Sequence, residues 1–181
     1  YSSAASDVYK RQHGDCLLLD FDHSKILIDC GPKSFKARRD VLANIEKILG
    51  ENSVIDIAIV THNDDDHIGG FEFLLDTSIK INTIVFNSLQ DIPDIIKNSQ
   101  KQISYNQDNA LKQRLLAERG IKTLCLTRDS SPLIINDITL TAITPTAEAL
   151  ECMLNDANVQ KEREEKKRRQ KQISREVVPH V

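Results

Sequence analysis

Residues 61–70 concentrate the side chains of this chain that could bind a metal ion. They read Thr-His-Asn-Asp-Asp-Asp-His-Ile-Gly-Gly, so two histidines and three aspartates lie within the six residues from His62 to His67. Imidazole is a ligand for zinc, manganese and iron, and carboxylate oxygen suits harder divalent ions. This mixture of ligands predicts a site for zinc or another transition metal. We call residues 61–70 the His-Asp loop.

Side chains on a tight turn can converge although their residues are close in sequence. We expect His62 and Asp64 to face one ion, and Asp66 and His67 to face a second ion a few Å away. Two such ions can share a bridging hydroxide and stabilise the charge of a hydrolytic transition state. The two glycines that end the loop would let the backbone pass close to the ions without a Cβ clash.

The neighbouring elements are expected to place the His-Asp loop at the end of a core strand. The preceding residues 54–60 are apolar and rich in β-branched side chains, which predicts a short buried strand. Residues 71–75, Phe-Glu-Phe-Leu-Leu, predict the packed start of a helix. The alternative is an aspartate-rich turn in which Asp65 or Asp66 only caps that helix. A cap alone does not account for the histidines, the strand and the double glycine together.

The loop resembles the His-x-His/Asp-x-Asp-His metal motif of the metallo-β-lactamase-fold hydrolases. Its form here, Thr-His-x-Asp-x-Asp-His-x-Gly-Gly, is most similar to the branch that includes the extracellular domain of competence-type DNA-uptake channel proteins. In that branch an aspartate, here Asp64, replaces the second histidine. The resemblance implies a metal-dependent hydrolase in which a metal-bound hydroxide attacks an ester-like bond, and it favours a phosphodiester substrate over a lactam.

The resemblance also implies a cofactor and a set of site residues. Two divalent metal ions are expected in the complete enzyme, with zinc as the first choice and manganese as the second. Their ligands would be His62, Asp64, Asp66 and His67, and Asp66 would also hold or orient the attacking water. The expected substrate is a small molecule or a phosphodiester, and nucleic acid is a candidate partner. The oligomeric state stays open.

Residues 13–32 resemble two further strands of this family, joined by a hairpin at residues 22–25. The second of these strands ends in Ile-Asp-Cys-Gly. By the resemblance, Asp29 lies beside the His-Asp loop and orients it as a carboxylate behind the metal ligands. The alternative for Asp29 is a turn-forming aspartate before Gly31 and Pro32.

The rest of the chain predicts an α/β fold. Residues 35–49 carry apolar side chains at helical spacing, and Gly50 would end that helix. Residues 87–109 are polar and would shape access to the site. The other predicted elements are strands at 79–86 and 121–126, a helix at 109–119 closed by Gly120, a hairpin of 132–135 and 138–143 with a turn at Asn136–Asp137, and a helix opened by Pro145.

The resemblance covers only the N-terminal half of the family's αββα sandwich. The family completes its metal site with a further histidine, a bridging aspartate and often a last histidine after the first motif. In this chain the only histidine after residue 67 is His180. We therefore expect residues 13–145 to form a partial sandwich, a mixed sheet with covering helices, whose C-terminal half is missing through truncation or lies on a separate chain. Such a fragment would be a weak or inactive catalyst alone.

The two ends of the chain differ in composition from its middle. Residues 1–12 lack an apolar period and resemble a translated sequencing-adapter scar, so we treat them as non-native and outside the fold. Residues 146–181 predict a charged helical extension and a tail. Within them, residues 161–171 hold seven basic and three acidic side chains and nothing apolar. This predicts a solvated helix or linker, with a nucleic-acid-binding arm as the alternative, which the lack of aromatic residues disfavours.

The overall composition excludes strong electrostatic attraction to nucleic acid or membranes. The 181 residues are 40% hydrophobic and carry a net charge of −3, and no run of 18 apolar residues occurs. Without such a run or a leader, we expect a cytoplasmic protein. Cys16, Cys30 and Cys125 are scattered in apolar runs, which predicts reduced core cysteines.

Two other classes of function are compatible with these features. The chain could be a non-catalytic scaffold that retains the fold and contacts a partner, or a nucleic-acid-binding module. All four predicted ligands are retained in the His-Asp loop, which favours metal chemistry over both alternatives.

Overall fold

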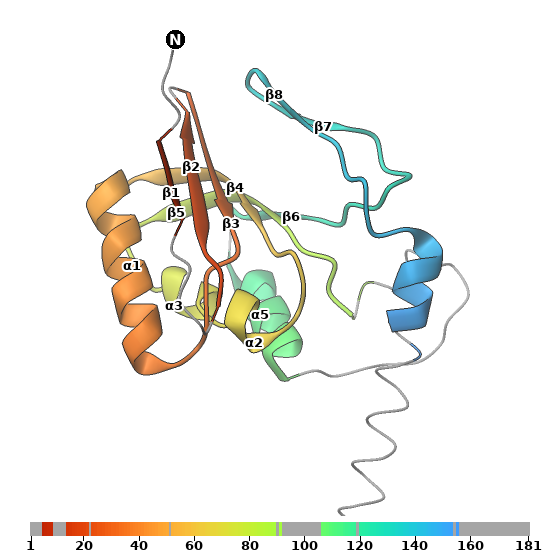
Figure 1. The fold of residues 1–181 in the computed structure, drawn as a ribbon, viewed down its shortest axis with the longest axis horizontal. Helices are drawn as coiled ribbons and strands as arrows, with labels where there is room; N and C mark the ends of the chain where they lie inside the picture. The colour runs from red at the N-terminus through yellow and green to blue at the C-terminus, as the bar shows by residue number, and fades with distance from the viewer. Residues whose placement is uncertain are drawn as a thin grey trace, which may run out of the picture.

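A six-stranded mixed sheet forms the centre of the fold, and helices pack on one of its faces (Figure 1). The computed structural model describes residues 5–8, 14–21, 23–50, 52–89, 91, 106–118, 120–153 and 155. The strands follow one another across the sheet in chain order: β1 (Ala5–Val8), β2 (Leu17–Phe21), β3 (Ser24–Ile28), β4 (Val54–Ile59), β5 (Lys80–Val85) and β6 (Lys122–Leu124). This mixed sheet with covering helices is the α/β fold that the sequence predicts.

The strand directions determine which loops meet at one edge of the sheet. Strand β2 is antiparallel to both β1 and β3, whereas β3, β4, β5 and β6 run parallel to one another. In this register Ile28 pairs with Ile59, and Ile59 pairs with Val85. The carboxyl ends of β3, β4 and β5 therefore lie side by side. Loops at such an edge are common ligand sites in parallel sheets.

The helices form where the apolar spacing predicts them. Helix α1 has the predicted bounds, Phe35–Leu49, and ends at Gly50, whose φ of 82° is unfavourable for residues with a Cβ. The other helices are α2 (Asp65–Ile68), α3 (Phe71–Leu74) and α5 (Asn106–Ala117), together with residues 147–153. Helix α5 begins earlier than the predicted residue 109.

The main hydrophobic core lies between the sheet and these helices. It contains buried side chains from β2 to β5 and from all four labelled helices, among them Leu27, Ile55, Ile84, Ile45, Ile68, Phe71 and Leu111. Each fully buried Leu, Ile or Phe stabilises the fold by about 1.5–3 kcal/mol. Because α2 and α3 contribute to this core, the segment that follows the His-Asp ligands is fixed by packing.

The opposite face of the sheet carries a smaller apolar cluster. Its buried members are Ile26, Ile57 and Val85, and the hairpin of β7 (Leu133–Ile135) and β8 (Ile138–Leu140) packs against them. The predicted turn at Asn136–Asp137 is confirmed, since Asn136 has a φ of 52°. Its side-chain amide donates to the His23 carbonyl and the Ser24 hydroxyl, at 2.7 Å each, which ties the hairpin to the β2–β3 turn.

The N-terminal segment contributes more than the sequence analysis expects. Residues 1–12 were excluded from the fold, yet Ala5–Val8 form β1 and pair antiparallel with β2. An edge strand needs only backbone hydrogen bonds, so it can form without an apolar alternation. The non-native origin of the segment stays a prediction.

Three further expectations concern cysteines, membrane spans and the C-terminal region. Cys16 and Cys30 are buried free thiols, as predicted, whereas Cys125 is half-buried. Among the helices in the described ranges, none is long and apolar enough to cross a bilayer. The charged stretch 161–171 and His180 lie outside the described residues.

Candidate metal centre

The His-Asp loop begins where β4 ends, at the edge shared with β3 and β5. The backbone continues to pair beyond the strands: Val60 N–H donates to the Val85 carbonyl, and Asp29 N–H donates to the Ile59 carbonyl, at 2.9 Å each. The loop then turns into the single-turn helix α2, which carries Asp66 and His67. The predicted position of the loop, at the end of a core strand, is therefore confirmed.

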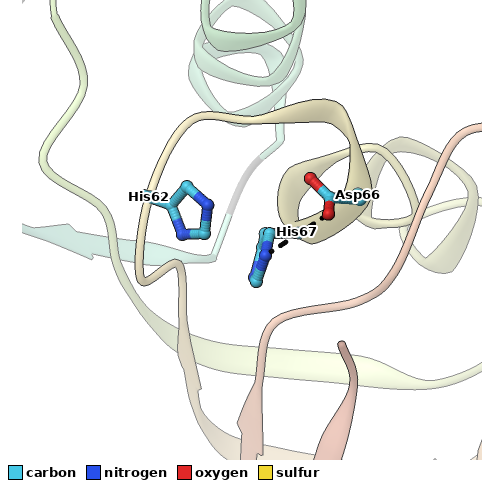
Figure 2. A group of neighbouring side chains, drawn as sticks. All are labelled: His62, Asp66 and His67. Atoms are coloured by element: carbon cyan, nitrogen blue, oxygen red, sulfur yellow. Dashed lines mark ion pairs between the residues drawn. The ribbon is translucent and has the colours of Figure 1, made fainter. Parts of the chain in front are cut away.

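Three of the predicted ligands come together on this loop (Figure 2). His62, Asp66 and His67 each offer one ligand atom, and these atoms lie within 4.8 Å of one another. His67 Nε2 is 3.6 Å from Asp66 Oδ2. Two zinc ligands at about 2.1 Å from the ion and at a tetrahedral angle lie about 3.4 Å apart. The residues therefore fit a divalent metal ion in both donor type and spacing.

Asp64 lies beside this group without belonging to it. Its Oδ2 atom is 3.5 Å from His62 Nε2, and its side chain is 78% exposed. The pairs expected to share an ion, His62 with Asp64 and Asp66 with His67, are thus each in contact. The histidine rings are also adjacent, with centroids 3.7 Å apart. The three residues able to hold one ion, His62, Asp66 and His67, therefore come from both of the predicted pairs. The role of each residue as a ligand stays a prediction.

Asp29 connects the end of β3 to the His-Asp loop. The residue is 3% exposed, and its carboxylate accepts from Thr61 N–H at Oδ1 (2.8 Å) and from Thr61 Oγ1 at Oδ2 (2.6 Å). The same Oδ2 atom is 2.8 Å from His67 Nδ1. These contacts join residues 32 and 38 positions apart in the chain. The side chain of Asp29 therefore binds the His-Asp loop, beside which the resemblance places it. The residue also has a φ of 56°, which is typical of a turn.

Thr61 is a residue that the sequence analysis missed. Its hydroxyl donates to Asp29 and lies 3.2 Å from His62 Nδ1, so toward His62 it can only accept. When both rings are neutral, His62 then carries its proton on Nδ1, and His67 likewise donates from Nδ1 to Asp29. Both Nε2 atoms are left with free lone pairs, the form in which imidazole binds a metal. A threonine before a histidine motif was the available sequence signal.

Backbone contacts hold the second half of the loop against the segment before β2 and against the β3–α1 connection. Asp66 and His67 accept through their carbonyls from the N–H groups of Asp15 at 3.2 Å and Cys30 at 2.9 Å. The glycines are also required by the packing of the backbone. A Cβ on Gly70 would overlap the Cys30 carbonyl, and one on Gly69 would overlap the backbone of the same connection. Their expected role in leaving room for the ions stays a prediction.

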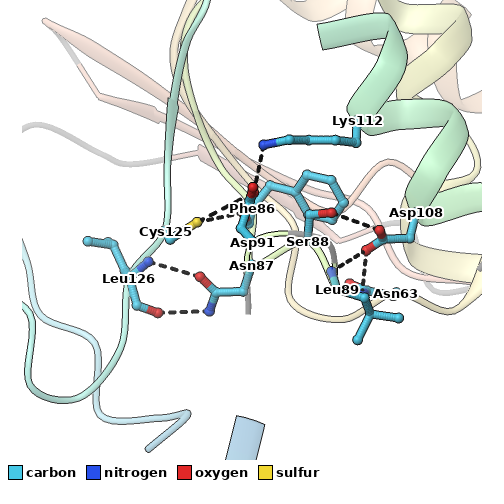
Figure 3. Close-up of polar contacts among 10 residues, drawn as sticks. All are labelled: Asn63, Phe86, Asn87, Ser88, Leu89, Asp91, Asp108, Lys112, Cys125 and Leu126. Atoms are coloured by element: carbon cyan, nitrogen blue, oxygen red, sulfur yellow. Dashed lines mark hydrogen bonds and ion pairs between the residues drawn. The ribbon is translucent and has the colours of Figure 1, made fainter. Parts of the chain in front are cut away.

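A second polar group behind the loop was also missed (Figure 3). Asp108, on α5, is 1% exposed and accepts from Asn63, Ser88 and the backbone N–H of Leu89. Burial is the main cause that raises the pKa of this carboxyl above its ordinary 3.8. The sequence around Asp108 shows only a polar stretch, and no local pattern singles this residue out.

A half-buried thiol lies near this polar group. Cys125 Sγ is 3.5 Å from the Phe86 carbonyl and 3.8 Å from Asp91 Oδ2, which forms an ion pair with Lys112 at 2.6 Å. Burial, followed by the Asp91 charge, raises the pKa of Cys125 to about 11. The thiol is therefore protonated at neutral pH and is a poor nucleophile.

Comparisons with known proteins find a family model that is similar to the central segment. Residues 18–89 match the model of the metallo-beta-lactamase superfamily domain. No curated protein matches the chain. The matched segment runs from β2 to the residues after β5 and includes both Asp29 and the whole His-Asp loop.

Similar solved structures include BJP-1, a subclass B3 metallo-beta-lactamase of Bradyrhizobium japonicum, with 21% identity and a TM-score of 0.48 over 78% of this chain and 50% of that chain. The metallo-beta-lactamase fold protein YhfI from Bacillus subtilis has 16% identity and a TM-score of 0.43, over 74% and 46%. The metallo-beta-lactamase SMB-1 has 16% identity and a TM-score of 0.46, over 74% and 48%. This chain thus spans about half the length of these structures.

The matched family model, the mixed sheet and the loop at its edge agree with one another. Residues 18–89 of this chain are therefore similar to the metallo-beta-lactamase superfamily domain.

Proposed function

We propose that this chain carries the metal-binding loop of a metal-dependent hydrolase. The observation that supports this most directly is the hydrogen-bond chain from His62 through Thr61 and Asp29 to His67. In neutral rings this arrangement leaves the lone pairs of both Nε2 atoms free beside the Asp66 carboxylate. A purely structural loop has no need to fix two imidazoles in their metal-binding form.

The residues of the loop would divide the work of hydrolysis. A divalent ion bound there would lower the pKa of water and stabilise the negative charge that develops in the transition state. His62 and His67 would hold the ion through Nε2. Asp66, whose side chain is half exposed, would hold or orient the attacking water and accept its proton. For the complete enzyme we propose two ions, zinc before manganese, with Asp64 as a further ligand.

For the substrate we propose an ester-like bond, with a phosphodiester before a lactam. The support is the aspartate at position 64, which resembles the motif of the competence-type DNA-uptake branch. The test compares a chromogenic phosphodiester, a carboxylic ester and a chromogenic cephalosporin as substrates of the zinc-loaded chain. Turnover of the cephalosporin alone would reject the proposed substrate class.

Metal content per chain tests the proposed site itself. We expect about one zinc ion on the parent chain, because three ligand atoms lie within reach of one ion. Asp64→Ala should keep that ion, whereas a His62→Ala, His67→Ala double variant should lose it. His23→Ala, which removes an exposed histidine from the β2–β3 turn, is the matched control and should keep it. A parent chain without bound zinc after reconstitution would reject the proposal in favour of a non-catalytic scaffold.

A further inference from the structure

A buried carboxylate on α5 reaches the middle of the His-Asp loop. Asn63, which lies between His62 and Asp64, donates from Nδ2 to Asp108 Oδ2 at 2.7 Å, and the two residues are 45 positions apart in the chain. We propose that Asp108, acting through Asn63, is a positioning residue for the metal site. This inference rests on the proposed function, since it assigns a part of the same site.

The position of Asp108 is itself fixed from a second side. Ser88 Oγ donates to its Oδ1 atom at 2.8 Å, and Leu89 N–H donates to Oδ2 at 3.0 Å. Both donors follow β5, at the sheet edge that also carries the loop. A 1% exposed carboxylate is costly to bury, and three donors offset that cost only while their geometry holds. Asn63 therefore donates to a carboxylate that Ser88 and Leu89 hold in place independently of the loop.

This contact differs in place from the other attachments of the loop. Asp29 holds its beginning at Thr61, the segment before β2 holds Asp66, and the β3–α1 connection holds its end at His67 and Gly70. Asn63 adds an attachment between them, next to one histidine of the three-ligand group. Consecutive Cα atoms are about 3.8 Å apart, so a displaced Asn63 also displaces His62. Metal sites tolerate ligand shifts of only about 0.2 Å.

The zinc affinity of variants, measured by competition with a chromogenic chelator, tests the inference. We expect Asn63→Ala to weaken zinc binding by about 10-fold, as loss of supporting contacts does at other metal sites. The absorption spectrum of the Co²⁺-substituted chain should change as well, because the ligand geometry around the ion changes. The melting temperature of the metal-free chain should stay within a few degrees of the parent, since Asn63 is only partly buried.

Two variants of Asp108 separate positioning from mere bulk. Asp108→Ala should weaken zinc binding at least as much as Asn63→Ala, and the double variant should be no weaker than Asp108→Ala alone. Asp108→Asn should bind within about threefold of the parent, because its amide oxygen can still accept from Asn63 and Leu89 while its NH₂ group donates to the Ser88 hydroxyl. If Asp108→Ala does not fold, the zinc affinities of Asn63→Ala and Asp108→Asn still test the inference.

Asn44→Ala is the matched control. Asn44 is a half-buried asparagine on α1 that donates to the Asp40 carbonyl at 2.7 Å and belongs to no contact of the loop described above. Its removal should leave zinc affinity and the Co²⁺ spectrum unchanged. Parent-like zinc binding by Asn63→Ala would overturn the inference, and so would zinc binding by Asp108→Asn as weak as that by Asp108→Ala. Neither result would affect the proposed function. A parent chain that binds no zinc would overturn the proposed function together with it.

Discussion

At the scale of single residues, the site is organised by side chains that need not touch the ion. Asp29 and Thr61 each face the Nδ1 atom of one histidine, which favours the proton of a neutral ring on Nδ1, and Asp108 accepts from Asn63 in the middle of the loop. Carboxylates in such positions act through geometry and tautomer rather than through coordination. Substitutions that keep their shape but change their hydrogen-bonding groups are therefore the informative ones.

Asp29→Asn should weaken zinc binding by about 10- to 100-fold without unfolding the chain. Asparagine tolerates the φ of 56° at this position, and its oxygen can still accept from Thr61 N–H. Its NH₂ group would face His67 Nδ1, which must then accept, so the proton moves to Nε2 and blocks coordination. Isothermal titration with zinc measures the affinity, and circular dichroism checks the fold. Unchanged affinity would contradict the assigned tautomer.

Asp108→Asn should change the pH dependence of stability. Burial raises the pKa of Asp108 above its ordinary 3.8, so the folded chain holds this proton more tightly than the unfolded chain does. The stability from this group is fully present below its unfolded pKa and is lost as the pH rises through the folded value. Asparagine does not titrate, so the variant does not lose stability in this way as the pH rises. Its unfolding free energy, relative to that of the parent, should therefore increase between about pH 4 and about pH 7.

Urea denaturation of both metal-free chains at the two pH values measures this difference. Because the same other carboxyls titrate in both proteins, the comparison isolates Asp108. A difference between variant and parent that shrinks as the pH rises would contradict the direction given for the pKa.

At the scale of elements, the site depends on three parallel strands that end side by side. Asp29 follows β3, the His-Asp loop follows β4, and Ser88 follows β5, so the sheet brings together residues distant in sequence. The loop then packs against the β3–α1 connection, where Gly70 N–H donates to the Gly31 carbonyl at 2.9 Å. This close approach makes the glycine at position 70 a structural requirement.

Gly70→Ala should destabilise the chain by at least about 3 kcal/mol, at the upper end of the cost of overpacking. The added Cβ would overlap the Cys30 carbonyl, and relief would require the Cys30 backbone to move. Gly120→Ala is the comparison, because its Cβ would meet nothing within 4 Å and only the φ of 106° resists substitution. We expect about 1–2 kcal/mol there. Chemical denaturation measures both, and equal losses would contradict the overlap.

At the scale of the whole molecule, the two faces of the sheet differ. Helices cover one face, whereas on the other Leu19, Phe21, Ile28 and Ile59 are only partly buried beside the β7–β8 hairpin. Apolar side chains that stay partly exposed on one face favour association. A sandwich of which only half is present would leave part of its sheet uncovered, and these partly buried side chains lie on the face away from the helices.

We therefore predict that the chain associates with itself through this face. Phe21→Ser should shift sedimentation velocity profiles toward monomer, because it removes apolar area from the exposed face. Phe35→Ser is the matched control: Phe35 is 67% exposed on α1 and lies outside this apolar cluster, so its removal should leave the profile unchanged. A parent chain that sediments as a single sharp monomer would contradict the prediction.

Local sequence patterns were enough to determine several elements and the candidate ligands. Residues 35–49, with their helical apolar spacing, form a helix, and the β-branched run before the loop forms a buried strand. Asn136–Asp137 form the predicted hairpin turn. These features depend on neighbours within a few positions, which is why periodicity and turn chemistry report them. The resemblance of the His-Asp loop likewise follows from ten consecutive residues.

Only the tertiary structure decided which side chains support that loop. Thr61 meets Asp29 across 32 positions, and Asn63 meets Asp108 across 45. Such contacts depend on the register of parallel strands and the packing of α5, and neither leaves a periodic trace in the sequence. The same reason explains the grouping of His62 with Asp66 and His67, and the strand at Ala5–Val8: each depends on where the backbone lies in space.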